Sequence, residues 1–202
     1  MADPKPITLN LPSKYSSRSA SPMASSPAPP TEWLIGTWTV THSTLSMWCS
    51  VRNVRITYKL LPPKSDGRLR IDDLVEYEPT GKTGVRKTVA GVDTQSTADG
   101  AGGWDWRGKG WLFFVGSHWE VLGWGEEART DGGRERWAVT WFAPTVFTKE
   151  GVDVYCDRRE GLSEQTYKKV EEALRGMEAR EVAGMVKEKM RVVEIKLPWT
   201  EE

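Results

Sequence analysis

The stretch VDVYCDRREGLSEQTYKKVEEAL, residues 152–174, joins an alternating apolar run to a helical pattern. Its first part alternates with the period of a β-strand, with apolar side chains at Val152, Val154 and Cys156. Ser163 stands where the N-cap of a helix is expected, and apolar residues then recur at helical spacing, at Tyr167, Val170, Leu174 and Met177. The stretch therefore predicts a last strand, a turn, and a helix over about 163–176 that continues, kinked or as a second helix, to about residue 190.

Upstream of this stretch, from Glu32 to about residue 158, the strand period recurs in short runs separated by turn residues. One run places on a single face Val54, Ile56, Tyr58 and Leu60, and the next alternates through Leu69, Ile71, Asp73, Val75 and Tyr77. Eight or nine short strands follow one another without an intervening helix. This order predicts a mainly β fold, in which an antiparallel sheet closes into a barrel or folds into a sandwich.

Size and charge narrow the class of protein. A chain of 202 residues suggests one domain, with or without a tail. Lysine plus arginine and aspartate plus glutamate number 28 each, and this balance argues against a nucleic-acid partner, which favours a basic surface. No run of apolar residues is long enough to predict a membrane-spanning helix. The 11 tryptophans are many for this length, so large rigid aromatic surfaces are expected to matter.

The first 31 residues differ in composition from the rest. The segment SSRSASPMASSPAPP, residues 16–30, is rich in Ser, Pro and Ala and has no apolar period. We therefore expect a disordered tail over 1–31 and a folded domain over 32–202. The tail lacks the apolar stretch of a secretory signal, which favours a cytoplasmic location. Because the segment is Ser-rich and nearly free of acidic residues, an organellar transit peptide is left open.

The cysteines and histidines are few. Cys49 and Cys156 are expected to be free, buried thiols, with a disulfide between them as the alternative. His42 and His118 do not form a Cys/His cluster with zinc spacing, so no metal and no cofactor are predicted. We expect both histidines at the surface or at the mouth of a barrel.

Motifs at the two ends of the strand region resemble those of the lipocalin family, within the calycin superfamily. Gly36-Thr37-Trp38 matches the Gly-x-Trp that begins the first barrel strand in that family. Arg158, followed by Leu162-Ser163 and a helix, matches the arginine that stacks on this tryptophan, and Arg159 is the weaker candidate. The resemblance implies an eight- to nine-stranded, antiparallel, up-and-down barrel, closed at one end by Trp38, with the C-terminal helix packed on its wall.

The chain also departs from that family. The loop motif Thr-Asp-Tyr is present only as Thr130-Asp131-Gly132, and the usual disulfides and export signal are missing. These departures indicate an outlying relative and weaken the transfer of any specific ligand.

If the apolar face of each strand points inward, aromatic side chains line the interior of such a barrel. The predicted ligand-binding residues are Tyr58, Tyr77, Trp106, Trp119 and Trp141, together with Trp48 in the loop over the open mouth. For each tryptophan, the alternative is that it simply fills the barrel.

Two residues are weak candidates for catalysis. The alternation that buries Ile71 and Val75 would point the Asp73 carboxylate inward, where it could anchor a polar head group or act as a general base. The alternative is a strand irregularity that turns it outward with Asp72. His118, which shares a strand face with Glu120, is the second candidate.

These features lead to two main hypotheses. The first is a protein that binds or carries a small hydrophobic molecule, such as a fatty acid, an isoprenoid or a pigment, inside the barrel. The second follows from resemblance to lipocalin-like enzymes of secondary metabolism, and is a cyclase or isomerase that acts on a hydrophobic substrate. A third possibility is an interaction module with exposed tryptophan patches. The oligomeric state is left open.

Overall fold

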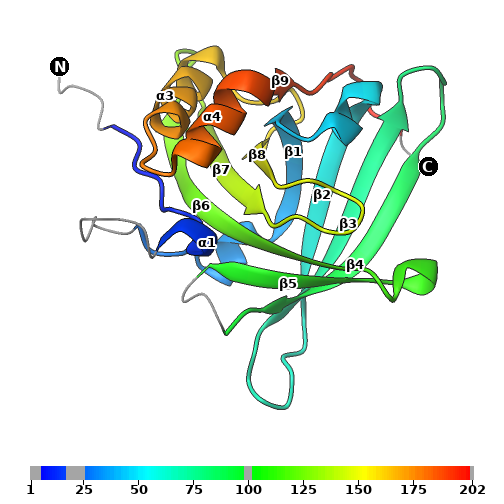
Figure 1. The fold of residues 1–202 in the computed structure, drawn as a ribbon. Coiled ribbons are helices and arrows are strands. Elements are labelled where there is room, and N and C mark those ends of the chain that lie inside the picture. Colours follow the sequence, from blue (N-terminus) through cyan, green and yellow to red (C-terminus); the bar gives the residue numbers. More distant parts are fainter. Residues whose placement is uncertain (1–5, 17–25, 98–101, 201–202) are drawn as a thin grey trace.

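The computed structural model describes residues 6–16, 26–97 and 102–200 (Figure 1). The described strands are β1 (Gly36–Ser43), β2 (Val51–Leu61), β3 (Arg70–Pro79), β4 (Lys87–Gln95), β5 (Gly103–Gly108), β6 (Gly116–Ala128), β7 (Arg134–Phe142), β8 (Gly151–Cys156) and β9 (Arg191–Val192). The described helices are α1 (Ser13–Ser16), α2 (Thr31–Leu34), α3 (Glu164–Arg175) and α4 (Arg180–Lys189), with short 3₁₀ helices η1 (Ser46–Ser50) and η2 (Gly110–Leu112).

The strands form one antiparallel sheet that closes on itself. Its order is β2-β3-β4-β5-β6-β7-β8-β1-β9, and β1 also pairs with β2, which completes a ring of eight strands. Each strand from β2 to β8 pairs with its neighbour in the chain, as in an up-and-down barrel. The predicted barrel is therefore confirmed, and the sandwich alternative is excluded.

The interior of the barrel follows the predicted alternation on β2 and β3. Val54, Ile56 and Tyr58 are buried in the interior core, and Ile56 lies opposite Val75 in the register of the two strands. Asn53 begins this alternation with a positive φ of 53°, at a point where the β2–β3 register shifts. A bulge of this kind lets the strand bend around the barrel.

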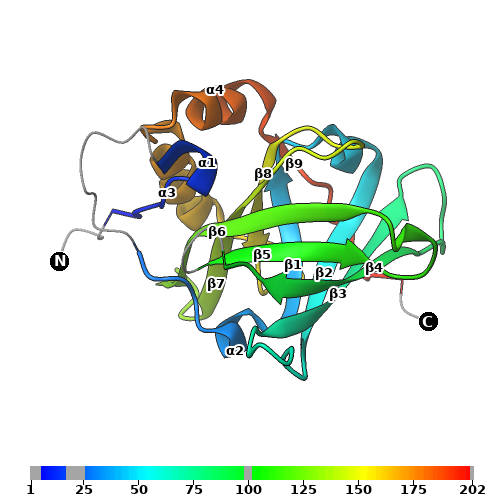
Figure 2. The same cartoon turned by 60° about the horizontal axis from the view of Figure 1, so that its bottom comes forward.

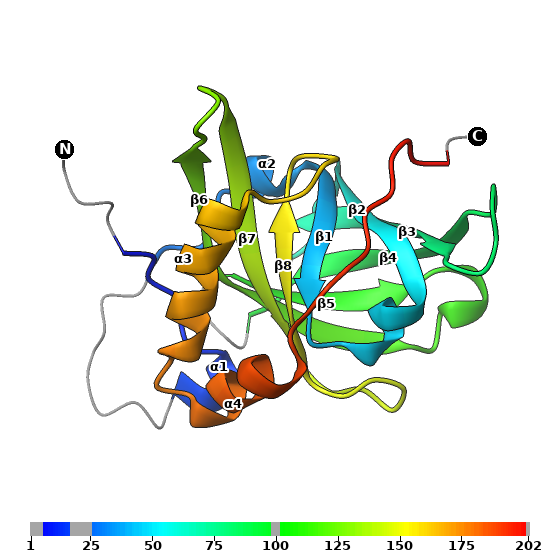
Figure 3. The ribbon, with the colours of Figure 1, turned by 90° about the horizontal axis from the view of Figure 1, so that it is seen from above.

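The C-terminal helices cover one side of the barrel, and Figure 3 shows α3 running along the outside of the wall beside β7. Helix α3 begins where predicted, with the Ser163 hydroxyl accepting a hydrogen bond from the Thr166 amide at 3.3 Å. Its apolar stripe, which includes Val170 and Leu174, packs into a second core outside the barrel. Helix α4 adds Val182 to this core. The two predicted helical segments are confirmed.

This second core overturns one prediction. On β7, Trp137, Val139 and Trp141 face the helices, and they belong to the outer core. The expectation that Trp141 points into the barrel is therefore wrong. The reason is that both faces of β7 are buried. Alternation of apolar residues therefore does not distinguish the face that points into the barrel from the face that lies beneath the helices.

The end of the chain is inserted into the wall. Strand β1 pairs with β2 only over residues 36–39, and β9 then pairs with the last part of β1. The Asn53 amide donates to the Glu194 carbonyl oxygen at 2.8 Å, so the terminal segment bridges the gap that opens between β1 and β2. Val193 is buried in the interior core. The segment is therefore a wedge between two strands.

The described parts of the N-terminal segment also pack on the barrel, in place of the disorder predicted for residues 1–31. Leu9 and Tyr15 are buried in the outer core, and the backbone N–H of Asn10 donates to the Leu122 carbonyl oxygen at 2.6 Å. Figure 1 and Figure 2 show α1 beside the barrel, where Ser13 donates to Glu120 of β6. Two apolar anchors are enough to hold a segment whose average composition predicts disorder. Residues 1–5 and 17–25 of the expected tail lie outside the described residues.

Trp38 closes one end of the barrel, but the arginine over it is not the predicted one. The Arg136 guanidinium lies 5.0 Å from the centre of the Trp38 ring, and Asp157 accepts its Nε–H at 2.9 Å. Arg158 instead donates to the Glu135 carboxylate and the Gly161 carbonyl oxygen, beside the start of α3. The predicted stacking of Arg158 is therefore wrong, because its neighbour Asp157 faces the closed end and holds Arg136 there. Arg159, the weaker candidate, lies over the ring of Trp199.

The cysteines and His42 also have definite places. Both thiols are free, but Cys49 is exposed, contrary to the prediction, and only Cys156 is buried. His42 stacks on Tyr167 of α3, with ring centres 3.4 Å apart. Burial under this helix lowers the pKa of His42 to about 4, so the ring is neutral. Its place is the interface between barrel and helix, rather than the surface or the mouth.

Candidate functional site: the barrel cavity

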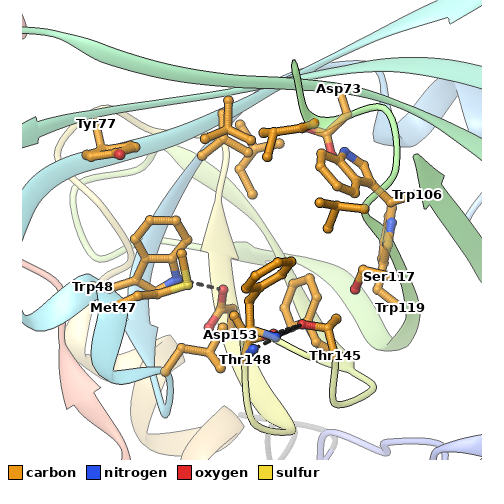
Figure 4. Close-up of a pocket in the computed structure, with 18 of the residues that line it drawn as sticks. Met47, Trp48, Asp73, Tyr77, Trp106, Ser117, Trp119, Thr145, Thr148 and Asp153 are labelled. Carbon is orange, nitrogen blue, oxygen red and sulfur yellow. Dashed lines mark hydrogen bonds between the residues drawn. The ribbon is translucent and has the colours of Figure 1, made fainter. Parts of the chain in front are cut away.

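The barrel interior contains a cavity of about 370 Å³ (Figure 4). Its walls come from the inward faces of β2–β8, and its rim comes from η1, the segment 111–115 and the segment 142–148. Most of the lining side chains are aromatic or aliphatic. The volume lies within the range of sites that hold one small molecule.

Five of the six aromatic residues predicted to bind a ligand lie in the cavity wall, namely Trp48, Tyr58, Tyr77, Trp106 and Trp119. Trp141 does not, and its indole N–H donates to the Glu150 carboxylate on the outer side, at 2.7 Å. The strand period therefore predicted correctly which aromatic side chains of β2, β3, β5 and β6 point inward, and it failed for Trp141 on β7.

The aromatic side chains hold one another in place. Tyr58 stacks on Trp119, with ring centres 5.7 Å apart, and Trp48 meets the edge of Tyr77 at 6.0 Å. Trp106 lies flat against the backbone of β4, where a Cβ on Gly91 would stand 2.1 Å from its Nε1 atom. Only glycine fits at position 91, and this close approach gives the cavity a smooth apolar wall.

The rim of the cavity is apolar and exposed. The side chains of Trp111, Phe114 and Phe147 line the cavity, yet they are 78%, 58% and 68% exposed. Exposed aromatic surface of this kind marks a place of contact with another molecule. No pattern in the sequence identifies these residues, because loops lack the periodicity that marks an inward face.

Asp153 is a buried carboxylic acid in the wall. One of its oxygens accepts the Ser43 hydroxyl, and the other accepts the Trp48 indole N–H at 3.3 Å. Desolvation raises the pKa of Asp153 to about 7, although the two hydrogen bonds act to lower it. Asp153 therefore fixes Trp48 over the cavity, as Figure 4 shows.

Asp73 also points inward, as the unbroken alternation of β3 required. It lines the cavity near Trp106 and is 7% exposed (Figure 4). Desolvation raises the pKa of Asp73 to about 7, and a hydrogen bond with Asp93 opposes this rise. The pKa of Asp93, which is fully buried behind the wall, is raised further by burial and by the charge of Asp73. Among the described carboxyl groups that line the cavity, Asp73 has an oxygen without a hydrogen-bond partner, and the Tyr155 hydroxyl in the same wall also lacks one.

His118 lies elsewhere. Its ring contacts Asp105 at 2.9 Å and Glu120 at 3.3 Å on the outer face of β5 and β6, and Glu120 also accepts the Ser13 hydroxyl at 2.5 Å. This cluster attaches α1 to the barrel, and the wall separates it from the cavity. His118 and Asp73 therefore do not form one site. The described residues contain no group of three or more His, Cys, Asp or Glu side chains arranged so that they could hold a metal ion.

Sequence reasoning missed Asp153 and Tyr155, two polar residues of the cavity wall. On β8 the apolar residues Val152 and Val154 face the helices, so the intervening polar residues face the interior. One signal could have revealed this arrangement. The apolar stripe of the helix over 163–176 needs an apolar partner, and the strand nearest to it in sequence offers one only on its Val152–Val154 face.

Comparisons with known proteins bear on the fold. No family model matches the chain, and no curated protein matches it. Among solved structures, lobster apocrustacyanin A1 is similar with a TM-score of 0.52 and 10% identity, over 96% of this chain and 93% of that chain. The siderocalin Ex-FABP has a TM-score of 0.49 and 11% identity, over 81% and 95% of the two chains. Apocrustacyanin C1 has a TM-score of 0.49 and 13% identity, over 80% and 77%.

At such identities a likeness shows the fold alone. The first of these matches spans nearly the whole of both chains, and it agrees with the closed eight-stranded ring. No described helix is long and apolar enough to cross a membrane. The chain therefore has a lipocalin-like barrel fold.

Proposed function

We propose that this protein binds a small hydrophobic molecule inside its barrel. The observation that carries the proposal is the cavity of about 370 Å³, walled by aromatic side chains and open at an apolar rim. Burial of apolar ligand surface contributes about 25 cal/mol per Å², so a largely enclosed ligand can be held without many polar contacts.

Among the three ligand classes considered, an isoprenoid or a pigment fits the cavity better than a fatty acid. None of the described lining residues is Lys, Arg or His. An ionised fatty acid would bring its carboxylate into an apolar cavity that already holds Asp73 and Asp153, with no cation to compensate it. A neutral terpenoid or polyene meets no such penalty.

The proposal is tested by titration with N-phenyl-1-naphthylamine, a neutral probe whose emission rises in apolar surroundings. We expect a saturable rise with one site per chain. Val89 lines the cavity, so the larger side chain of Val89→Trp should fill part of it. We expect this variant to bind the probe at least tenfold more weakly. Thr88→Trp is the matched control, since Thr88 is its exposed neighbour on β4. A rise that does not saturate, or that Val89→Trp leaves unchanged, contradicts the proposal.

A cyclase or isomerase acting on a hydrophobic substrate is a second candidate function. The observation that favours it is the buried Asp73–Asp93 pair, since an acid with a pKa of about 7 can both give and take a proton at neutral pH. Incubation with neutral isoprenoids, followed by chromatography, would reveal a product. Loss of that product in Asp73→Asn, with probe binding intact, would support this function, and a lack of product from the intact protein would count against it.

A further inference from the structure

The side chains of the cavity wall that can carry a charge are acidic. Asp73 and Asp153 line it, Asp93 stands directly behind Asp73, and the described lining residues include no basic side chain. All three carboxyl groups are more than nine-tenths buried. An interior of this composition repels anions and favours ligands that carry a hydrogen-bond donor or a positive charge.

Hydrogen bonding distinguishes the three carboxyl groups. Both oxygens of Asp153 have donors within the protein. Asp93 Oδ1 accepts the Trp119 indole N–H at 2.7 Å. Asp73 Oδ1, by contrast, has no hydrogen-bond partner among the described residues, although it is buried and its side chain lines the cavity. Asp93 Oδ2 is also without a partner, but Asp93 does not line the cavity.

An acceptor buried without a donor is costly, and proteins seldom keep one without a reason. The cost here falls on Asp73, whose side chain lines the cavity that a ligand would fill. Trp106 and Trp119 line the same cavity, and the faces of indole rings attract cations in a site from which water is excluded. An acceptor next to aromatic faces is the arrangement that suits an ammonium group.

We propose that the ligand is an apolar amine, whose protonated nitrogen donates to the Asp73 carboxylate while its hydrocarbon part fills the aromatic cavity. This inference rests on the proposed function and specifies the class of ligand for the same site. It differs from that proposal in requiring a polar head of defined charge.

The protonation behaviour of the pair agrees with this arrangement. Burial raises the pKa of Asp73 to about 7 and that of Asp93 well above its ordinary value, so Asp73 is only partly ionised at neutral pH. The other groups that act on these carboxyls are the phenols of Tyr58 and Tyr155, with Asp72, Lys109 and Asp105 farther out. A bound cation would stabilise the ionised form of Asp73. Binding near pH 7 should then release a proton, and affinity should rise from pH 5.5 to pH 8.

The test compares three ligands that differ only in the head group, namely decylamine, decan-1-ol and decanoate, by titration calorimetry at pH 7.5. We expect decylamine to bind most tightly and decanoate least. Asp73→Asn should weaken decylamine binding about ten- to a hundredfold, the usual effect of a lost charged hydrogen bond, and change decan-1-ol binding less than threefold. Asp72→Asn is the matched control, because Asp72 is the next residue of β3 and ion-pairs with Lys109 on the outer face.

A second readout separates charge from fit. Calorimetry in two buffers of different ionisation enthalpy should report proton release on decylamine binding to the native protein, and no release for Asp73→Asn. Equal binding of decylamine and decan-1-ol, or an amine preference that survives in Asp73→Asn, would overturn this inference. If decan-1-ol and the neutral naphthylamine probe also fail to bind, the proposed function itself fails. If they bind without any preference for the amine, only the present inference fails.

Discussion

Asp73 places a buried carboxyl group in the cavity wall, where burial disfavours its ionised form. It lies on β3 between Ile71 and Val75, a position where the alternation demands an apolar side chain. Natural sequences break such local rules mostly at functional sites. The strand keeps its register at this position, so the backbone is undistorted. The free-energy cost is therefore the burial of the carboxyl group.

We predict that Asp73→Asn stabilises the protein at pH 8 and not at pH 4. The folded protein holds the proton of Asp73 up to a pKa of about 7, whereas the unfolded chain releases it near the ordinary value of 3.8. Native stability contributed by this residue therefore falls as pH rises from about 4 to about 7. One pKa unit corresponds to about 1.4 kcal/mol, so the gain at pH 8 is on the order of a few kcal/mol.

Urea unfolding of both proteins at the two pH values measures this difference. The control is again Asp72→Asn, whose side chain is partly exposed on the outer face. Asp153 retains its own raised pKa in the variant, so some decline of stability between pH 4 and pH 7 should persist. A loss of stability at pH 8 in Asp73→Asn would mean that the carboxylate is paired in the fold and would contradict the burial argument.

At the scale of elements, the sequence predicted which segments are strands and helices better than which face each strand turns inward. On β2 and β3 the alternation of apolar and polar residues was enough to identify the inward face, because the outer faces of these strands carry Arg, Asp and Glu. On β7 and β8 it was not, because α3 and α4 cover the outer faces and both sides of the wall are buried. The misplacement of Trp141 and the omission of Asp153 have this one cause.

The C-terminal wedge lay beyond sequence reasoning for a different reason. Nothing in the pattern of β1 indicates that it separates from β2 after Thr39, so nothing in the sequence indicated a gap to be bridged. Likewise, Arg136 rather than the predicted Arg158 lies over Trp38 at the closed end, because of the side that Asp157 faces. Both are tertiary facts that spacing along the chain does not encode.

We predict that the wedge contributes to the stability of the barrel through a single apolar side chain. Val193→Ala should lower the free energy of unfolding by about 1–3 kcal/mol, because Val193 is 2% exposed in the interior core. Val192→Ala should change it by less than about 0.5 kcal/mol, because Val192, the preceding residue, is 73% exposed. Urea unfolding followed by circular dichroism compares the two variants. Equal effects would show that the wedge adds only backbone hydrogen bonds.

At the scale of the whole molecule, the barrel has two unlike ends. One end is closed by Trp38 beneath Arg136, with Trp33 packed 5.0 Å from the Trp38 ring centre. The other end is the open rim around the cavity. The sequence predicted this polarity through Gly36 and Trp38, and it predicted the barrel and its helix. It did not predict that residues 6–16 anchor to the outer wall, because composition averages over the few side chains that bind.

We predict that the rim controls how long a bound molecule stays. The double variant Trp111→Ala/Phe147→Ala should release N-phenyl-1-naphthylamine several-fold faster, because these side chains cover the cavity and most affinity differences within one site arise from dissociation. Its stability should change by less than about 1 kcal/mol, since both residues are mostly exposed. Stopped-flow displacement measures the rate. Leu60→Ala is the control, since Leu60 is 54% exposed and does not line the cavity. An unchanged rate in the double variant would mean that the probe leaves by another route or that the rim does not contact it.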